Sequence, residues 1–267
     1  SDNEGDQESG SIACGKCLPV CMASVAHLLK QTGKEIALRA QGGQHVDERL
    51  LTLWGHPGSP KTFRSIWMLE ELGVHYRLEP VSEAFEPGLQ KSNPDGRTPC
   101  IQHGDFVLCG ESVAINTYLG DVFGLGLVPA AGSQERAIYD QWCFFAVTEL
   151  ELQALQIHHR HVVMADIHGH ADVAVQTAEA HFLRQAAIAE RWMDASYVER
   201  GGPYILGANF SAVDIVFAHL LRWADTIGWL PRHMSMLHTY LVASTDRDAF
   251  QRTMRLEQKY VGNGIQL

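Results

Sequence analysis

The chain has 267 residues, 46% of them hydrophobic, which is enough to bury one large core or two smaller ones. It carries 31 acidic and 21 basic residues, and this net charge of −10 argues against a nucleic-acid-binding surface, which needs clustered Lys and Arg. The apolar runs, such as residues 143–147, are far shorter than the ~20 residues that a membrane span requires. We therefore expect a soluble protein with no nucleic-acid partner and no membrane span.

The cysteines indicate a reducing compartment. Their spacing is unlike the disulfide framework of a small secreted domain, because half of them lie in the first 21 residues and the others in strand-like or helix-like segments. The chain begins with the acidic stretch 1–6 and shows no signal or transit peptide. We expect a cytoplasmic protein. The alternative is a location in an organelle, after removal of a leader peptide. The six cysteines are Cys14, Cys17, Cys21, Cys100, Cys109 and Cys143.

Residues 1–49 form a distinct N-terminal extension. Residues 1–10 are polar and acidic, a composition typical of disorder. Apolar residues between 18 and 31 recur at helical spacing and predict a short amphipathic helix. We regard residues 12–45 as a candidate segment for binding a protein partner.

A regular pattern of strands and helices begins at Leu50. Residues 50–54 predict a buried strand, and Ser59-Pro60 predicts a helix with Ser59 as its N-cap and Pro60 as its first residue. This helix ends at Gly73. The further elements predicted in this part of the chain are a strand over 74–78, a turn at 93–96, a hairpin over 100–108 and a helix from 111 to about 123.

After residue 132 only helical periodicity remains. The chain is therefore predicted to have an α+β fold: a βαβ-ββα domain over residues 50–125, followed by an all-α domain over residues 132–260. The predicted helices cover 133–163, 173–198, 211–227 and 234–259.

Four motifs follow one another in this order. They are 53–60 with Arg64 and 69–73, then 93–99, then 111–115 with Tyr118 and Leu119, and finally 205–207 with 210–215. Together they resemble the active-site turn, the cis-proline turn, the glutathione-recognising helix and the C-terminal capping box of the soluble glutathione transferases. The resemblance covers residues 50–260 and implies a thioredoxin-like first domain, with glutathione as co-substrate.

The resemblance implies that Ser59 is the catalytic residue. In the serine-using classes a hydroxyl at this turn donates a hydrogen bond to the glutathione sulfur and favours its thiolate, and a helix N-terminus adds to this effect. The alternative is that Ser59 only caps the helix, with Thr62 or His56 as substitutes. A cysteine is absent at this position, so disulfide exchange at the turn is not expected.

The same resemblance implies the glutathione-binding residues. Thr98 and a cis Pro99 would present backbone to the cysteinyl part, whereas the alternative is an ordinary trans bond. Glu111 and Ser112 would hold the γ-glutamyl part at a helix N-terminus, whereas the alternative is a plain helix start. Several classes place a basic residue after the second strand, where this chain has the acidic and apolar stretch 83–87. Lys91 and Arg97 are the candidates to replace that basic residue at the glycyl end of glutathione.

No metal site is predicted, although two groups of residues contain possible metal ligands. Residues 158–161, with His168 and His170, are rich in histidine, but Arg160 interrupts them and a solvated loop at the mouth of a hydrophobic site is favoured. Cys14, Cys17 and Cys21 would need a fourth ligand such as His27. Ser211 and Asp214 are interpreted as a structural capping box.

The expected function is conjugation of the glutathione thiolate to a small hydrophobic electrophile, by a homodimer. The electrophile would bind between the domains, beside His56 and the helix over 133–163, with Phe144, Phe145 and His158 as candidate wall residues. The alternative is a non-catalytic subunit of a larger assembly, docked through its N-terminal extension. Retained glutathione binding would separate the two functions.

Overall fold

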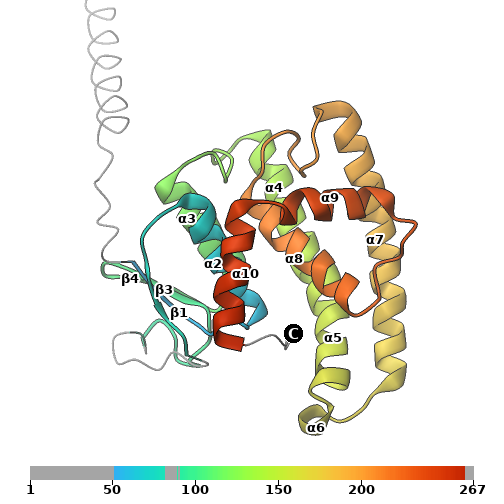
Figure 1. Cartoon of the computed structure of the whole chain (residues 1–267), viewed down its shortest axis with the longest axis horizontal. Coiled ribbons are helices and arrows are strands. Elements are labelled where there is room, and N and C mark those ends of the chain that lie inside the picture. Colours follow the sequence, from blue (N-terminus) through green and yellow to red (C-terminus); the bar gives the residue numbers. More distant parts are fainter. Residues whose placement is uncertain (1–50, 82–88, 90, 262–267) are drawn as a thin grey trace, which may run out of the picture. The chain divides into compact units, whose positions relative to one another are not determined.

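The computed structural model describes residues 51–81, 89 and 91–261 (Figure 1). The N-terminal extension, with its predicted helix and its three cysteines, and the stretch 83–87 lie outside the described residues. Within the described part of the chain, no helix is both long enough and apolar enough to cross a membrane.

A four-stranded mixed sheet is built from the first part of the chain. Strand β1 runs parallel to β2 and antiparallel to β3, and β3 and β4 form the predicted hairpin. Strand β2 is shorter and begins later than predicted, because only three of its residues pair with β1, while Val74 and Tyr76 pack on the core beside the ladder. The strands are β1 (Leu51–Trp54), β2 (Arg77–Glu79), β3 (Cys100–His103) and β4 (Phe106–Cys109), in the order β2-β1-β3-β4.

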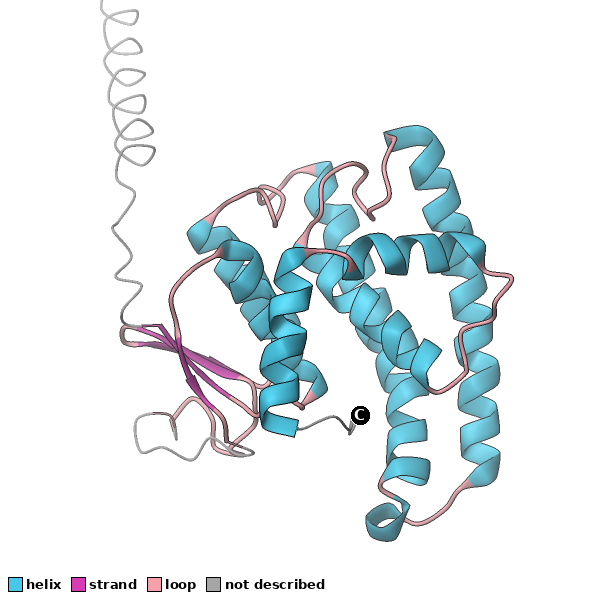
Figure 2. Cartoon of the chain, viewed as in Figure 1, coloured by secondary structure: helices cyan, strands magenta, loops and turns pink. Residues whose placement is uncertain are grey.

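Helices α2 (Pro60–Leu72) and α3 (Ser112–Phe123) bury apolar faces against the sheet (Figure 2). Helix α2 begins at Pro60 as predicted, and Gly73 ends it with a φ of 64°, a conformation that favours glycine. Because side chains alternate along a strand, Leu51, Leu53 and Ile101 meet these helices, and their neighbours face the opposite side.

The rest of the described chain is helical, as predicted. The predicted helix 133–163 is one continuous run, but it contains two π-helical stretches that the sequence did not reveal. Residues 158–161 lie in this helical run, so the prediction of a loop there was wrong, whereas His168 ends α6 (Ala165–His168) and His170 lies in the connection that follows it. The run consists of α4 (Gln134–Phe145), η2 (Ala146–Leu155), α5 (Gln156–His158) and η3 (His159–Val163).

The predicted helix 234–259 is two helices. The chain breaks at Asp246 and Arg247, where the Arg247 guanidinium binds both carboxylate oxygens of Glu71 in α2 at 2.7 Å. The helices that complete the fold are α6 (Ala165–His168), α7 (Asp172–Arg200), α8 (Ala212–Thr226), α9 (Ser235–Thr245) and α10 (Asp248–Val261).

Helix α8 is the central helix of the helical part, and α10 lies beside α2 (Figure 1). The predicted capping box starts α8: Asp214, fully buried, accepts from the Ser211 backbone N–H at 2.8 Å and from its hydroxyl at 2.7 Å. The Asp214 carboxylate also accepts from the Ile205 backbone and from the Tyr240 hydroxyl. The order of strands and helices confirms the predicted thioredoxin-like sheet domain followed by helices.

Candidate active site

The turn before α2 is closed by backbone contacts. Gly55 has a φ of 153°, and a side chain there would collide with Thr62, so a glycine lets the turn lie against α2. The Ser59 N–H donates to the His56 carbonyl at 2.9 Å, and the Gly58 N–H donates to His56 Nδ1 at 3.2 Å. These bonds present Ser59 at the N-terminus of α2.

The Ser59 side chain makes no capping hydrogen bond to α2, although the residue occupies the N-cap position. The capping interpretation required such a hydrogen bond, so the hydroxyl is not used by the helix. Of the two substitutes, Thr62 is fully buried under Gly55, and only His56 is partly exposed. Ser59 is itself partly exposed and stays the best-placed hydroxyl.

A second segment is fixed by Asn93. Its buried side chain donates to the Arg97 carbonyl at 2.9 Å and accepts from the Arg97 N–H at 2.8 Å. The peptide bond between Thr98 and Pro99 is cis, as expected. Pro99 is buried and leads directly into β3.

Strand pairing and two hydrogen bonds bring the turn, the cis-proline segment and the start of α3 together. Trp54, at the end of β1, lies opposite Cys100. The Gly110 N–H donates to the Pro99 carbonyl at 2.8 Å, and the Gly110 carbonyl accepts from Lys61 Nζ at 3.4 Å. The predicted site residues Ser59, Pro99 and Ser112 thus belong to segments that meet.

Two cations flank Glu111. Its carboxylate oxygens lie 3.1 Å from Lys61 Nζ and 3.1 Å from Arg97 Nη2. Lys61 was missed by the sequence analysis, since it is 50 residues from Glu111 in the chain. Ser112 is buried at the first position of α3, and Lys91 lies exposed in the turn before Asn93.

Helix α10 contributes a second residue that sequence reasoning missed. The rings of Tyr260 and His56 meet edge to face, with their centroids 6.4 Å apart. Tyr260 follows the predicted end of the last helix by one residue. It places an aromatic side chain beside the Ser59 turn.

The candidate wall residues of the electrophile site are dispersed. Phe145 is buried among Trp142 and Trp192, Phe144 is 70% exposed, and His158 packs edge to face on Trp229. None of the three has a described contact with the Ser59 turn.

A hollow of about 830 Å³ lies between the η2–α5 run and α7, and no residue of the Ser59 turn or of α10 lines it. It is therefore separate from the site around Ser59. Its lining includes Leu152, Ile157, Val173, Ala178, His181 and Arg184.

A buried polar cluster joins α2 to the helical part. Arg64 Nη1 lies 2.7 Å from Glu151 Oε2, and Arg64 Nε donates to His219 Nδ1 at 3.3 Å. Burial acts to raise the pKa of the Glu151 carboxyl, but the charge of Arg64 and its hydrogen bond outweigh this and lower it. Burial, together with the positive charges of Arg64 and Arg222, holds the pKa of His219 well below its usual value. This cluster therefore contains a charged carboxylate and a neutral imidazole.

Within the described ranges, no group of three His, Cys, Asp or Glu side chains is arranged to hold a metal ion. The histidines of the helical run contact other groups instead. His159 meets Trp223 edge to face, and His161 Nδ1 lies 2.8 Å from the Gly169 carbonyl oxygen. The Cys14, Cys17 and Cys21 group lies outside the described residues.

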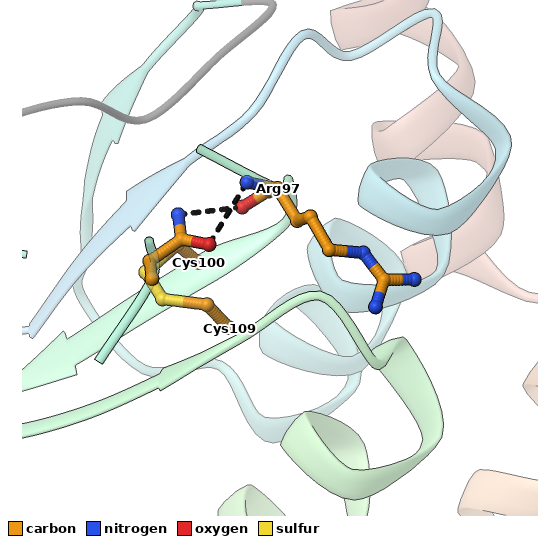
Figure 3. Close-up of a disulfide and its surroundings, with 4 residues drawn as sticks. Arg97, Cys100 and Cys109 are labelled. Carbon is orange, nitrogen blue, oxygen red and sulfur yellow. Dashed lines mark hydrogen bonds between the residues drawn. A yellow bond between two sulfur atoms is a disulfide. The ribbon is translucent and has the colours of Figure 1, made fainter. Parts of the chain in front are cut away.

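A disulfide joins Cys100 and Cys109 across the hairpin (Figure 3). This disulfide was not predicted from the sequence, although counting outward from the turn at Gly104 and Asp105 places the two cysteines opposite each other. Cys100 lies in a segment predicted as a strand of the hairpin, and it is buried in β3.

Comparison with known proteins gives a consistent result. Residues 50–121 match the family model described as Glutathione S-transferase, N-terminal domain. Glutathione S-transferase 1 of Triticum aestivum is 36% identical over 110 residues, which cover 38% of this chain and 45% of that protein. The chain thus spans less than half the length of the curated relatives that it matches.

Solved structures share the fold over most of the described chain. The glutathione transferase URE2P8 from Phanerochaete chrysosporium, crystallised with oxidized glutathione, has a TM-score of 0.67 and 22% identity, covering 81% of this chain and 98% of that one. Ure2p5 from the same organism, cocrystallised with 1-(S-glutathionyl)-2,4-dinitrobenzene, has a TM-score of 0.68 and 18% identity, covering 80% and 97%. At these identities the likeness shows the fold.

Proposed function

We propose that this chain is a soluble glutathione transferase and that it conjugates the thiolate of glutathione to a small hydrophobic electrophile. The observation that carries the proposal is the Ser59 hydroxyl, which stands at the N-terminus of α2 without capping it. In this role it donates a hydrogen bond to the glutathione sulfur. The donor and the helix dipole both favour the thiolate over the thiol.

The remaining glutathione contacts come from the two segments that meet the turn. The backbone of Thr98, before the cis Pro99, pairs with the cysteinyl part of glutathione. Ser112 and the N-terminus of α3 bind the γ-glutamyl carboxylate, and Glu111 binds the α-amino group. Neighbours of the same fold were crystallised with oxidized glutathione and with a glutathione conjugate, which supports glutathione as the ligand.

Lys61 and Arg97 supply positive charge to this site. Both reach Glu111, so they hold its carboxylate in place and offset the acidity of the chain near an anionic ligand. Lys91, which is exposed and further along the turn, is the candidate for the glycyl carboxylate. The electrophile would bind beside His56 and Tyr260, where binding places it next to the sulfur and contributes by proximity.

The test is the rate of conjugation of a chlorodinitroarene by Ser59→Ala. We expect kcat/KM to fall about tenfold or more, equivalent to about 1.4 kcal/mol of transition-state stabilisation, with little change in glutathione affinity. Ser133→Ala is the matched control, because Ser133 is the N-cap of α4 and its hydroxyl does accept from the Arg136 N–H, at 3.0 Å. Equal turnover by Ser59→Ala and Ser133→Ala would remove Ser59 from the mechanism.

We also propose a homodimer, in which the sheet domain of one subunit packs on the helical part of the other. Light scattering should give twice the chain mass of 29.6 kDa. A mass equal to one chain at micromolar concentration would contradict this assembly. The non-catalytic alternative depends on residues 1–49, which lie outside the described residues.

A further inference from the structure

Cys100 and Cys109 occupy a special pair of positions in the hairpin. They are the first residue of β3 and the last residue of β4, and they lie directly opposite each other. The next pair outward is joined by the hydrogen bond from the Gly110 N–H to the Pro99 carbonyl. Hydrogen-bonded and non-hydrogen-bonded pairs alternate along an antiparallel ladder, so the cysteines occupy a non-hydrogen-bonded pair, where side chains approach most closely.

The two cysteine residues differ in exposure. Both cysteines face the side of the sheet opposite α2, in a small cluster with Leu89, Trp54 and Val107. Cys100 is fully buried and Cys109 is partly exposed. We therefore expect a thiol or disulfide arriving from solvent to react at Cys109 before Cys100.

The pair also joins the two segments that the proposed function assigns to glutathione. Cys100 follows the cis Pro99, and Cys109 is separated from Glu111 by Gly110 alone. Figure 3 shows the Arg97 guanidinium turned away from the disulfide. The disulfide thus lies behind the glutathione contacts and ties their backbones together without occupying the site.

We propose that Cys100 and Cys109 form a dithiol–disulfide couple that exchanges with glutathione disulfide, and that its oxidised form holds the glutathione site in its binding geometry. The exchange stands on the position and exposure of the two cysteines. Its effect on binding rests on the proposed function. This thiol site is separate from the Ser59 turn, which has no cysteine.

The exchange takes place in two balanced steps. In the first, the Cys109 thiolate attacks one sulfur of glutathione disulfide; a Cys109–glutathione disulfide forms, and one glutathione leaves as thiolate and takes up the proton that Cys109 lost. In the second, the Cys100 thiolate attacks the Cys109 sulfur; the Cys100–Cys109 bond forms and the second glutathione leaves in the same way. Two thiols are oxidised and one glutathione disulfide is reduced to two molecules of glutathione.

Cys143 provides an internal control. It is a free cysteine in α4, and burial raises its pKa to about 12. Because the thiolate is the attacking species, a buried thiol with a raised pKa exchanges slowly. The Cys143→Ser variant should therefore exchange as the wild type does.

The first measurement follows the pair by mass spectrometry. The reduced full-length protein is equilibrated without oxygen in buffers of varied glutathione to glutathione disulfide ratio, quenched with acid and alkylated. Trypsin leaves both cysteines in the peptide 98–136, and cleavage before Asp105 separates them. We expect the peptide to change reversibly from two alkyl groups to none as the glutathione disulfide fraction rises.

Single variants test the order of the steps. Cys100→Ser should accumulate the mixed disulfide on Cys109, because the second step is lost, whereas Cys109→Ser should accumulate little on buried Cys100. A pair that stays reduced at every ratio would overturn the proposal, as would an adduct that forms faster on Cys100 than on Cys109.

The second measurement compares the oxidised and reduced wild type in their affinity for S-methylglutathione by calorimetry, because this ligand has no free thiol and leaves the disulfide intact. We expect the oxidised form to bind about fivefold more tightly, at the lower end of the coupling typical of linked sites. Equal affinities would overturn the effect on binding. If the wild type shows the exchange but no conjugation activity, the proposed function alone is contradicted.

Discussion

Arg64 of α2 and Glu151 of η2 form an ion pair, with 2.7 Å between Nη1 and Oε2, in which both side chains are almost fully buried. Arg64 lies five residues after Ser59, so the pair attaches the helix that presents the candidate catalytic hydroxyl to the helical part of the chain. The buried side chain of Asn116 donates to the Arg64 carbonyl at 3.2 Å and adds a contact from α3.

We expect Glu151→Ala to lower the free energy of unfolding by about 3–5 kcal/mol, because it leaves the buried Arg64 cation without its partner. Urea denaturation followed by circular dichroism measures the change. The matched control is Asp225→Ala, which removes the partner of Arg232, an 84% exposed side chain, at 3.6 Å. The control should change stability by less than about 1 kcal/mol, as is usual for exposed pairs. Similar losses in the two variants would show that the Arg64–Glu151 pair contributes no more than a surface pair.

The neutral His219 predicts a loss of stability on acidification. Its folded pKa is lowered by burial and by Arg64 and Arg222, so the unfolded chain binds a proton that the folded protein does not. The stability is therefore present above the unfolded pKa of about 6.5 and falls as the pH drops below it, by at most about 1.4 kcal/mol per pH unit for one proton.

The test compares the wild type with His219→Gln between pH 7 and pH 5; burial raises the pKa of Asp214 and of Glu257, and both carboxyl groups are present in the two proteins. A glutamine keeps an acceptor for Arg64 Nε and cannot take up a proton, so this component of the pH dependence should disappear. His158, whose pKa burial also lowers, contributes equally to both proteins. Parallel stability curves for the two proteins would contradict the assignment.

Local signals in the sequence predicted most of the fold. Ser59-Pro60 and Gly73 mark the ends of α2, and Ser211 with Asp214 marks the start of α8, because caps and turns depend on neighbouring residues. The cis bond at Pro99 followed from the family resemblance.

Long-range pairs could not be predicted in this way. Lys61 and Glu111 are 50 residues apart, and Arg64 and Glu151 are 87 apart, so no periodicity joins them. At the break between α9 and α10, Arg247 contacts Glu71, a partner 176 residues away. The disulfide could have been predicted, since the hairpin register counted from the Gly104 turn pairs its two cysteines.

The two cations at Glu111 predict an effect on catalytic efficiency. Lys61→Met should lower kcat/KM for glutathione, mainly through a higher KM, because a charge near the γ-glutamyl end is lost. Both ion pairs are largely exposed, so we expect a loss of no more than about tenfold. The effect should weaken at high salt, which screens the wild-type charge.

Arg77→Met is the control for charge alone. Arg77 is exposed in β2 and pairs with Glu79 instead of Glu111. An equal KM change in both variants would assign the effect to net charge and remove Lys61 from the site.

The most direct measurement of the central claim is the pKa of the glutathione thiol bound to the protein. Titrating the ultraviolet absorbance of the bound thiolate gives this pKa without turnover. For the wild type we expect a value about one to two units below that of a free thiol, which is near 8.5. Ser59→Ala should return the value most of the way to the free thiol, and Ser59→Thr, which keeps the hydroxyl, should return it less. If the wild type and Ser59→Ala bind glutathione with the same thiol pKa, Ser59 does not stabilise the thiolate and the proposed mechanism is wrong.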